Sequence, residues 1–449
     1  MKTKEYKNNI TEGVIWKQLL LFFFPLLFGT FFQQLYNTVD AVVVGQFVGK
    51  EALAEVGGAS AMVINIFVGF FVGISSGATV TISQFFGGGR MREVRESIHT
   101  AVALSVTAGL GIMVIGLVSA PVLLSVMKTP PETMEGSILY LRIYFCGMVG
   151  NLIYNMGSGV LRAMGDSKRP LYFLIASCLV NVVLDIVLVA AAGLGVAGVA
   201  IATILSQAFS AVLVCITLLR FPEEYRLQPR NIRFHGWVLK RIIAIGIPAG
   251  FQSLMYSLSN ALIQTNVNSF GTDTVAAWTA YSKIDALFWM VVSAFGISIT
   301  TFVGQNYGAG LYQRVRKGVR QCFLITALFT LVLNVMIFSF GHLLFRLFTK
   351  DTAVIEIGIM MIRFLVPAFM TYICIEIYSG ALRGMGDSLI PMLITCGGIC
   401  GLRVVWLFIV VPKWNSMKTV MASYPITWVI TSILFLIYYS WYTKKHDIR

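Results

Sequence analysis

Two carboxylates lie inside long apolar stretches in the first half of this sequence. Asp40 belongs to the apolar segment 15–43, and Asp185 belongs to the segment 170–192. An ionisable side chain is costly inside a membrane, so each of them is a candidate functional residue. At about 1.5 Å per residue of helix, both carboxylates reach the outer half of a bilayer, and so does Thr203. Two buried carboxylates that meet hold a proton readily, and oxygen ligands suit hard cations such as Na⁺.

Other polar residues share the helix faces of these two carboxylates. They are Gln33, Tyr36 and Asn37, which form a stripe with Asp40, and Asn181, four positions before Asp185. Residues three or four apart lie on one face of a helix, so the pattern predicts an oxygen-rich cluster around two negative charges. No Lys or Arg occurs at that depth in the first half. Our hypothesis is a cation-coupling role, and the alternative is that each Asp forms a hydrogen-bonded contact between helices.

The second half of the chain carries a different set of intramembrane charges. These are Lys283, Asp285, Glu376 and Arg403, whose charges sum to zero. Because a buried charge requires a partner, we interpret the set as a structural or gating ion network, with substrate contact as the alternative. Unbalanced negative charge is therefore expected in the first half only.

The elements that must position these residues are membrane-spanning helices. Of the 449 residues, 57% are apolar and 12% charged, against about 25% charged in an average soluble domain. This excludes a soluble enzyme, a secreted disulfide scaffold and a disordered chain. Twelve apolar segments are long enough to span a bilayer, at residues 15–43, 52–78, 97–122, 136–161, 170–192, 194–219, 240–267, 275–303, 320–347, 355–380, 389–411 and 420–442. The predicted fold class is an all-α polytopic membrane protein with 12 transmembrane helices.

Basic residues between the segments predict how the chain is oriented. The net charge of +14 is concentrated in alternate short links, such as 90–95, 162–169 and 314–320. Basic links face the cytoplasm, so both termini are expected there, and the even number of crossings agrees. Because the positive charge lies in these links, we expect the lipid bilayer as its partner and no nucleic acid. The seven cysteines lie in apolar stretches without a CxxC pair, which indicates core packing rather than a metal site.

The chain contains an internal repeat. The sequence Gly159-Val-Leu-Arg-Ala-Met-Gly-Asp-Ser167 returns 221 positions later as Gly380-Ala-Leu-Arg-Gly-Met-Gly-Asp-Ser388. Both copies predict a tight turn, with positive φ at the second glycine and an aspartate cap on the next helix. Each half holds six segments, so the repeats are parallel, as in a two-lobed transporter. We expect an N-terminal lobe at 1–219, a polar cytoplasmic linker at 220–239 and a C-terminal lobe at 240–449.

These motifs together resemble those of the multidrug and toxic compound extrusion (MATE) family of bacterial antiporters. The resemblance is carried by Pro25 with Gln33-Gln-Leu-Tyr-Asn-Thr-Val-Asp40, by the duplicated Leu-Arg-x-Met-Gly-Asp-Ser link, and by Asn181-x-x-x-Asp185 followed by Thr203. It implies a V-shaped pair of six-helix bundles that exports cationic amphipathic compounds in exchange for H⁺ or Na⁺. It further implies a cation site made of Asp40, Asn181, Asp185 and Thr203, with Gln33 and Tyr36 beside it.

The resemblance also implies a bacterial cytoplasmic-membrane protein that works as a monomer, needs no cofactor and is not an enzyme. Some members carry an acidic residue in the seventh helix. Residues 247–266 have none, so the resemblance does not extend to a second-half cation site of that kind.

Three alternatives are weighed against a cation-coupled exporter: a lipid-linked precursor flippase of the same superfamily, a major-facilitator transporter and a membrane-embedded enzyme. The flippase would need basic residues in its central cavity, whereas the first half offers carboxylates.

Overall fold

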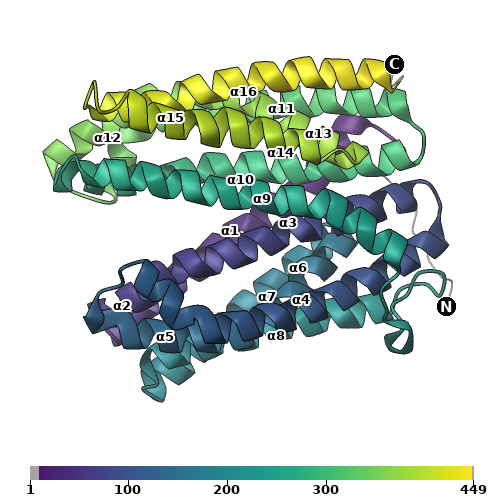
Figure 1. The fold of residues 1–449 in the computed structure, drawn as a ribbon, viewed down its shortest axis with the longest axis horizontal. Coiled ribbons are helices and arrows are strands. Elements are labelled where there is room, and N and C mark those ends of the chain that lie inside the picture. Colours follow the sequence, from purple (N-terminus) through teal and green to yellow (C-terminus); the bar gives the residue numbers. More distant parts are fainter. Residues whose placement is uncertain (1–9, 447–449) are drawn as a thin grey trace. The chain divides into compact units, whose positions relative to one another are not determined.

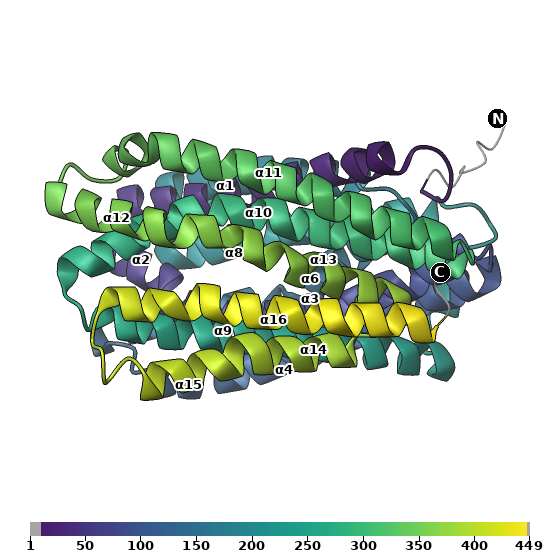
Figure 2. The same ribbon diagram turned by 90° about the horizontal axis from the view of Figure 1, so that it is seen from above.

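The computed structural model describes residues 10–446, and every regular element in that range is helical (Figures 1 and 2). The α-helices are α1 (Ile15–Phe47), α2 (Lys50–Gly57), α3 (Ala59–Gly87), α4 (Met91–Val126), α5 (Pro131–Cys146), α6 (Met148–Ala163), α7 (Lys168–Asp185), α8 (Gly195–Leu219), α9 (Gly236–Asn268), α10 (Thr272–Gly308), α11 (Tyr312–Arg346), α12 (Thr352–Leu365), α13 (Phe369–Met385), α14 (Leu389–Thr395), α15 (Leu402–Ile409) and α16 (Met417–Lys445). Two π-helical segments, η1 (Ile186–Ala191) and η4 (Cys396–Gly401), and two 3₁₀ turns, η2 (Pro229–Asn231) and η3 (Val366–Ala368), complete the described chain. The predicted all-α fold class is confirmed. The chain ends predicted to be cytoplasmic, residues 1–9 and 447–449, lie outside the described residues.

Twelve membrane spans can be counted in the described chain. Eleven are single helical stretches that are long and apolar enough to cross a bilayer. The twelfth is the pair α5 and α6, whose axes bend by 51° at Gly147. Gly147 also lies close to α8, where a Cβ would come within 2.4 Å of Cγ2 of Ile204. The twelve predicted segments are therefore all present, but the one predicted at 136–161 is a broken span.

The helices group into two compact units. Unit 1 contains residues 24–250 of the described chain, and unit 2 contains residues 10–23 together with 251–446. The grouping thus divides the chain inside α1 and inside α9, beside Pro25 and Pro248. Residues 220–239, the segment predicted to link two lobes, belong to unit 1.

Unit 1 is built around α6, which packs against α3, α4 and α8, while α3 also packs against α4 (Figure 1). Its core contains fully buried aromatic and aliphatic side chains, among them Phe71, Leu141, Phe145 and Leu152. The first part of α9 also packs in this unit. It crosses α3 so closely that Gly77 of α3 lies against the backbone of α9. A Cβ on Gly77 would lie 2.3 Å from the carbonyl oxygen of Ile242, so only glycine permits this approach.

Unit 2 packs α10 against α11 and α13, and α13 against α16. The segments α14 and α15 lie along α16 (Figure 2). Stacked aromatic rings fill the core, with the ring centroids of Phe288 and Phe369 4.1 Å apart. The start of α1 joins this core, because the rings of Phe23 and Phe295 stack with centroids 3.9 Å apart.

The duplicated link forms the same turn in both units. Gly165 and Gly386 have φ values of 90° and 100°, in the left-handed region that favours glycine. Oδ1 of Asp166 accepts from the backbone N–H groups of residues 168 and 169, each at 3.1 Å. Asp387 accepts from the N–H of Ile390 at 3.4 Å. Both the positive φ and the aspartate caps predicted from the repeat are confirmed.

Candidate functional site

The four residues of the predicted cation site come together in unit 1. Asp40 lies on α1, Asn181 and Asp185 on α7, and Thr203 on α8. All four are buried, with exposed fractions of 9% for Asp40, 3% for Thr203 and 0% for the pair on α7. Asp185 is the last residue of α7 and is followed directly by the π-helical segment η1, a feature frequent at functional sites.

Asn181 connects the two carboxyl groups. With its amide oriented to donate, Nδ2 lies 2.8 Å from Oδ1 of Asp40 and 3.3 Å from Oδ2 of Asp185. The carboxyl groups of Asp40 and Asp185 therefore face the same amide and lie within electrostatic range of each other. Two ionised carboxylates this close repel each other, and a bound cation relieves the repulsion. The arrangement is therefore complete when the pair carries one proton, or another cation in its place.

Several oxygens around this pair have no hydrogen-bond partner among the described residues. They are Oδ1 of Asp185, Oγ1 of Thr203 and the hydroxyl of Tyr36. No Lys or Arg forms an ion pair with either carboxyl group in residues 10–446. A buried polar atom without a partner costs free energy, and a buried unpaired charge costs more. These oxygens and the two carboxyl groups together make a buried site that a small cation would satisfy.

We expect removal of the Asn181 amide to destabilise the protein. Asn181→Leu leaves both carboxyl groups without their shared donor, a loss of about 1–3 kcal/mol of folding free energy. Thermal unfolding of the purified protein should show a lower Tm than wild type. The matched control is Asn231→Leu, since Asn231 is exposed on the surface. An unchanged Tm for Asn181→Leu would contradict the bridging role.

The polar stripe predicted on the first helix divides into two parts. Tyr36 is half-buried beside Thr203 and Ser206, on the side that faces Asp40. Gln33 and Asn37 are exposed in this structure, and among residues 10–446 neither forms a hydrogen bond with the carboxyl pair. At 3.6 residues per turn, these four positions cover an arc of about 100°, and only one edge of that arc can face the interior. The structure thus does not place Gln33 and Asn37 in the cluster.

Two tyrosines and a glutamine that sequence reasoning missed surround the site. Tyr140 and Tyr144 lie on α5 within electrostatic range of Asp40, with their rings 6.2 Å apart. Nε2 of Gln207 on α8 donates to the hydroxyl of Tyr144 at 3.4 Å. The spacing of the tyrosines by four residues indicates one helix face, which was available from the sequence. That α5 packs against α8 was not.

The predicted ion network of the second half is not formed. Among the described residues, no ion pair joins Lys283, Asp285, Glu376 and Arg403. Lys283 is exposed, and it cannot face Asp285 because residues two apart lie on different sides of a helix. Aromatic groups take the place of opposite charges in unit 2.

Each of the other three charged groups has its own aromatic partner. Asp285 accepts from Nε1 of Trp289 at 2.7 Å, and Glu376 accepts from the hydroxyl of Tyr372 at 3.4 Å. Arg403 is almost fully buried and lies 4.2 Å from the ring centroid of Tyr424, a cation–π contact. Each of the three groups thus contacts an aromatic side chain, and Glu376 also lies within electrostatic range of Arg383.

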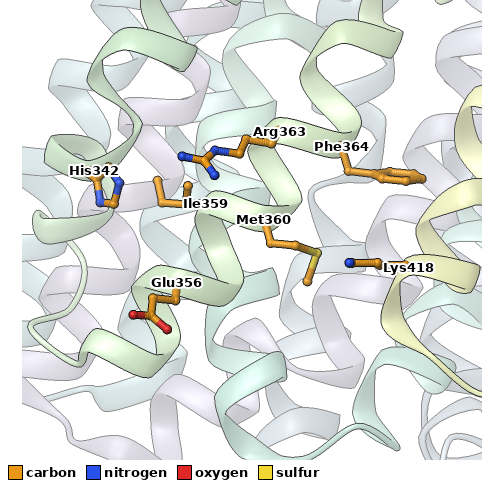
Figure 3. Close-up of a pocket in the computed structure, with 7 residues that line it drawn as sticks. All are labelled: His342, Glu356, Ile359, Met360, Arg363, Phe364 and Lys418. Carbon is orange, nitrogen blue, oxygen red and sulfur yellow. The ribbon is translucent and has the colours of Figure 1, made fainter.

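Unit 2 also contains a cavity of about 480 Å³ outside the predicted site (Figure 3). It is lined by His342 of α11, by Glu356 and Arg363 of α12, and by Lys418 of α16. The carboxylate of Glu356 and the ammonium group of Lys418 lie on opposite sides of the lining. Mixed charge of this kind selects no single class of ligand, so the buried carboxyl pair of unit 1 is the stronger candidate site.

Comparison with known proteins connects both units to one family. The family model described as MatE matches residues 25–187 and 248–409, one match in each half of the repeat. The "Probable multidrug resistance protein YoeA" of Bacillus subtilis is 26% identical over 97% of this chain and 95% of its own length. The "Probable multidrug resistance protein NorM" of Thermotoga maritima is 27% identical over 90% of this chain and 87% of its own.

A solved structure shares the fold of the whole chain. "Crystal structure of MATE in the bent conformation" aligns with a TM-score of 0.91 at 21% identity, covering 99% of this chain and 98% of that chain. At that level of identity the likeness concerns the fold alone. It agrees with the twelve helical spans described above.

Proposed function

Because the chain belongs to the MatE family, we propose that it is a secondary active transporter that exports cationic amphipathic compounds in exchange for H⁺ or Na⁺. The single observation that carries the proposal is the buried pair of Asp40 and Asp185, which has no basic partner among the described residues. A cation-coupled transporter needs a site whose charge changes when the ion binds. Relatives of this chain are named as probable multidrug resistance proteins, which supports multidrug efflux as its role.

The proposed cycle rests on competition at the carboxyl pair. When Asp40 and Asp185 are both ionised, they repel each other and favour either an organic cation or a helix arrangement that admits one. When H⁺ or Na⁺ binds, the negative charge of the pair falls, and both carboxyl groups can stay together on the Asn181 amide. The ion shifts this equilibrium only if it binds the two states with different affinity. Competition of this kind exchanges one cation for the other.

Helix α1 is the element that would transmit the change. Asp40 and Pro25 lie on this helix, and Pro25 removes one backbone hydrogen bond because it has no N–H group. A helix weakened at one turn can bend there at low cost. We propose that neutralisation of Asp40 alters how the outer part of α1 packs against α7, and that α1 bends near Pro25 as the drug leaves.

The same proposal covers location and partners. We place the protein in a bacterial cytoplasmic membrane with both termini in the cytoplasm, since the basic links between spans face that side. It would act as a monomer, with no cofactor and no catalytic reaction. The carboxylates of unit 1 favour an organic cation as cargo over the pyrophosphate of a lipid-linked precursor, which requires basic groups.

The test is transport in reconstituted vesicles with ethidium as a fluorescent cation. We expect ethidium movement to follow an imposed gradient of the coupling ion and to stop when that gradient is collapsed. Comparing rates at fixed pH with and without Na⁺ identifies the ion: a rate that needs Na⁺ indicates sodium coupling, and a rate that follows only ΔpH indicates proton coupling. Ethidium movement that is indifferent to both gradients would contradict antiport.

A further inference from the structure

A second cavity in unit 2 has a strongly basic lining and takes no part in the proposed transport cycle. Its volume is about 710 Å³, and it opens between α11, α13 and α16. Its lining includes three basic residues and three aromatic ones: Arg316, Lys317, Arg320, Phe323, Tyr378 and Tyr439. Among residues 10–446, no acidic side chain lines it. A cavity with three cations and no acid is suited to an anion.

The three cations of this basic cavity are uncompensated. In residues 10–446, none of the side chains of Arg316, Lys317 and Arg320 forms an ion pair or a hydrogen bond. Other arginines in links between spans do pair, for example Arg90 with Glu93 at 2.9 Å and Arg169 with Asp166 at 3.2 Å. The positive charge of the cavity is therefore available to a ligand.

The aromatic wall contributes a hydroxyl group that lacks a partner. The rings of Phe323 and Tyr378 stack with centroids 6.1 Å apart, and the rings of Tyr378 and Tyr439 lie 4.8 Å apart. The hydroxyl of Tyr439 is buried and has no hydrogen-bond partner among the described residues. Arg316 lies within electrostatic range of it. A phosphate oxygen would accept from this hydroxyl and from the guanidinium groups.

Comparison of the two repeats shows that two of the three cations and both tyrosines of the basic cavity occur in the second half only. The repeat spacing of 221 residues pairs Lys317 with Glu96 and Arg320 with His99. In unit 1 the chain itself covers these two positions. Nε1 of Trp237 donates to Glu96 at 3.1 Å, and the N–H of Gln228 donates to Nε2 of His99 at 3.1 Å. The same spacing pairs the two tyrosines of the cavity with a glycine and a leucine.

The two repeats therefore differ in what lies against equivalent helices, α4 in unit 1 and α11 in unit 2. In unit 1 a peptide segment covers this part of α4. In unit 2 the corresponding part of α11 lines an open cavity and carries cations in place of Glu96 and His99. Below it, α11 presents an exposed apolar stripe at Leu324, Leu328 and Leu331, a spacing that follows one helix face.

We propose that this basic cavity binds the headgroup phosphate of an anionic phospholipid, whose acyl chains lie along the apolar stripe of α11. A phosphate near Arg316, Lys317 and Arg320 gains charge-assisted hydrogen bonds, and tyrosines are enriched where membrane spans meet the headgroups. Basic pockets between helices on the cytoplasmic side are the usual site of such headgroups, and this end of α11 carries one of the basic links predicted to face that side.

The test measures lipid binding to the purified full-length protein in neutral detergent by native mass spectrometry. Phosphatidylglycerol is titrated in one arm, phosphatidylethanolamine in a second and inorganic phosphate in a third. The variant Arg316→Gln/Lys317→Gln/Arg320→Gln should bind phosphatidylglycerol at least about tenfold more weakly, since each cation near a headgroup contributes to binding. Tyr439→Phe keeps the ring and should give a smaller loss, of about twofold.

The matched control is Arg220→Gln/Arg230→Gln/Arg233→Gln, which removes the same charge from exposed positions of the segment 220–239. It should bind phosphatidylglycerol like wild type, and thermal unfolding should confirm that each variant is folded. Equal binding by the cavity variant and wild type would overturn the proposal, and so would an equal loss in the control. Binding of phosphatidylethanolamine as tight as phosphatidylglycerol, or displacement of the lipid by millimolar inorganic phosphate, would also overturn it.

Discussion

Replacing Asp40 or Asp185 with asparagine, one at a time, is expected to reduce ion-driven ethidium export at least about tenfold. Each substitution keeps the size of the side chain and removes its ability to change charge. An ion drives a transporter only through its different affinity for two states, and about 5.5 kcal/mol of difference is needed to move an equilibrium from 1:99 to 99:1. Without both carboxyl groups, that difference is lost. The measurement is initial efflux rate in cells and in vesicles.

The control for this experiment is Asp273→Asn. Asp273 is an exposed acid in the first turn of α10, so the same chemical change there should leave efflux intact. Immunoblots of membrane fractions must show equal amounts of each variant. Near-normal export by either single mutant of the carboxyl pair would falsify the competition mechanism, even if the protein proved to be an exporter.

The second large effect is expected at the crossing of α3 and α9 in unit 1. Gly77→Ala places a Cβ 2.3 Å from the carbonyl oxygen of Ile242 and 2.7 Å from the backbone nitrogen of Gly246. Backbone atoms cannot move aside as the end of a flexible side chain can, so the two helices must separate. Overpacking of this kind costs about 1–3 kcal/mol or more. We expect a clearly lower Tm and a reduced yield of folded protein.

Gly111→Ala provides the comparison. Gly111 lies on α4 in the same unit, and a Cβ there would meet nothing within 4 Å. Alanine should be tolerated or should stabilise the helix slightly, because glycine is the poorer helix former by about 1 kcal/mol. If Gly77→Ala and Gly111→Ala unfold at the same temperature, the close approach of α3 and α9 does not limit stability.

The twelve spans and the repeated turn were readable from local patterns. A bilayer demands about 20 apolar residues in a helix that satisfies its own backbone, so each span is visible wherever its residues lie in the fold. The left-handed φ of Gly165 and Gly386, and the caps made by the aspartates that follow them, depend on neighbours within four residues. Features that depend only on nearby residues can therefore be predicted from the sequence.

The composition of the site depended on how the helices rotate and pack. Both Asp40 and Asn37 are polar residues of one stripe, but only Asp40 turns toward α7. Tyr144 enters the site because α5 packs on α8, and Arg403 meets Tyr424 rather than an acid because of where α15 lies on α16. Rotation about a helix axis and the choice of neighbour are settled by contacts between residues far apart in the chain. The sequence alone shows which polar residues lie in membrane spans. Only the packing of the helices determines which of them come into contact.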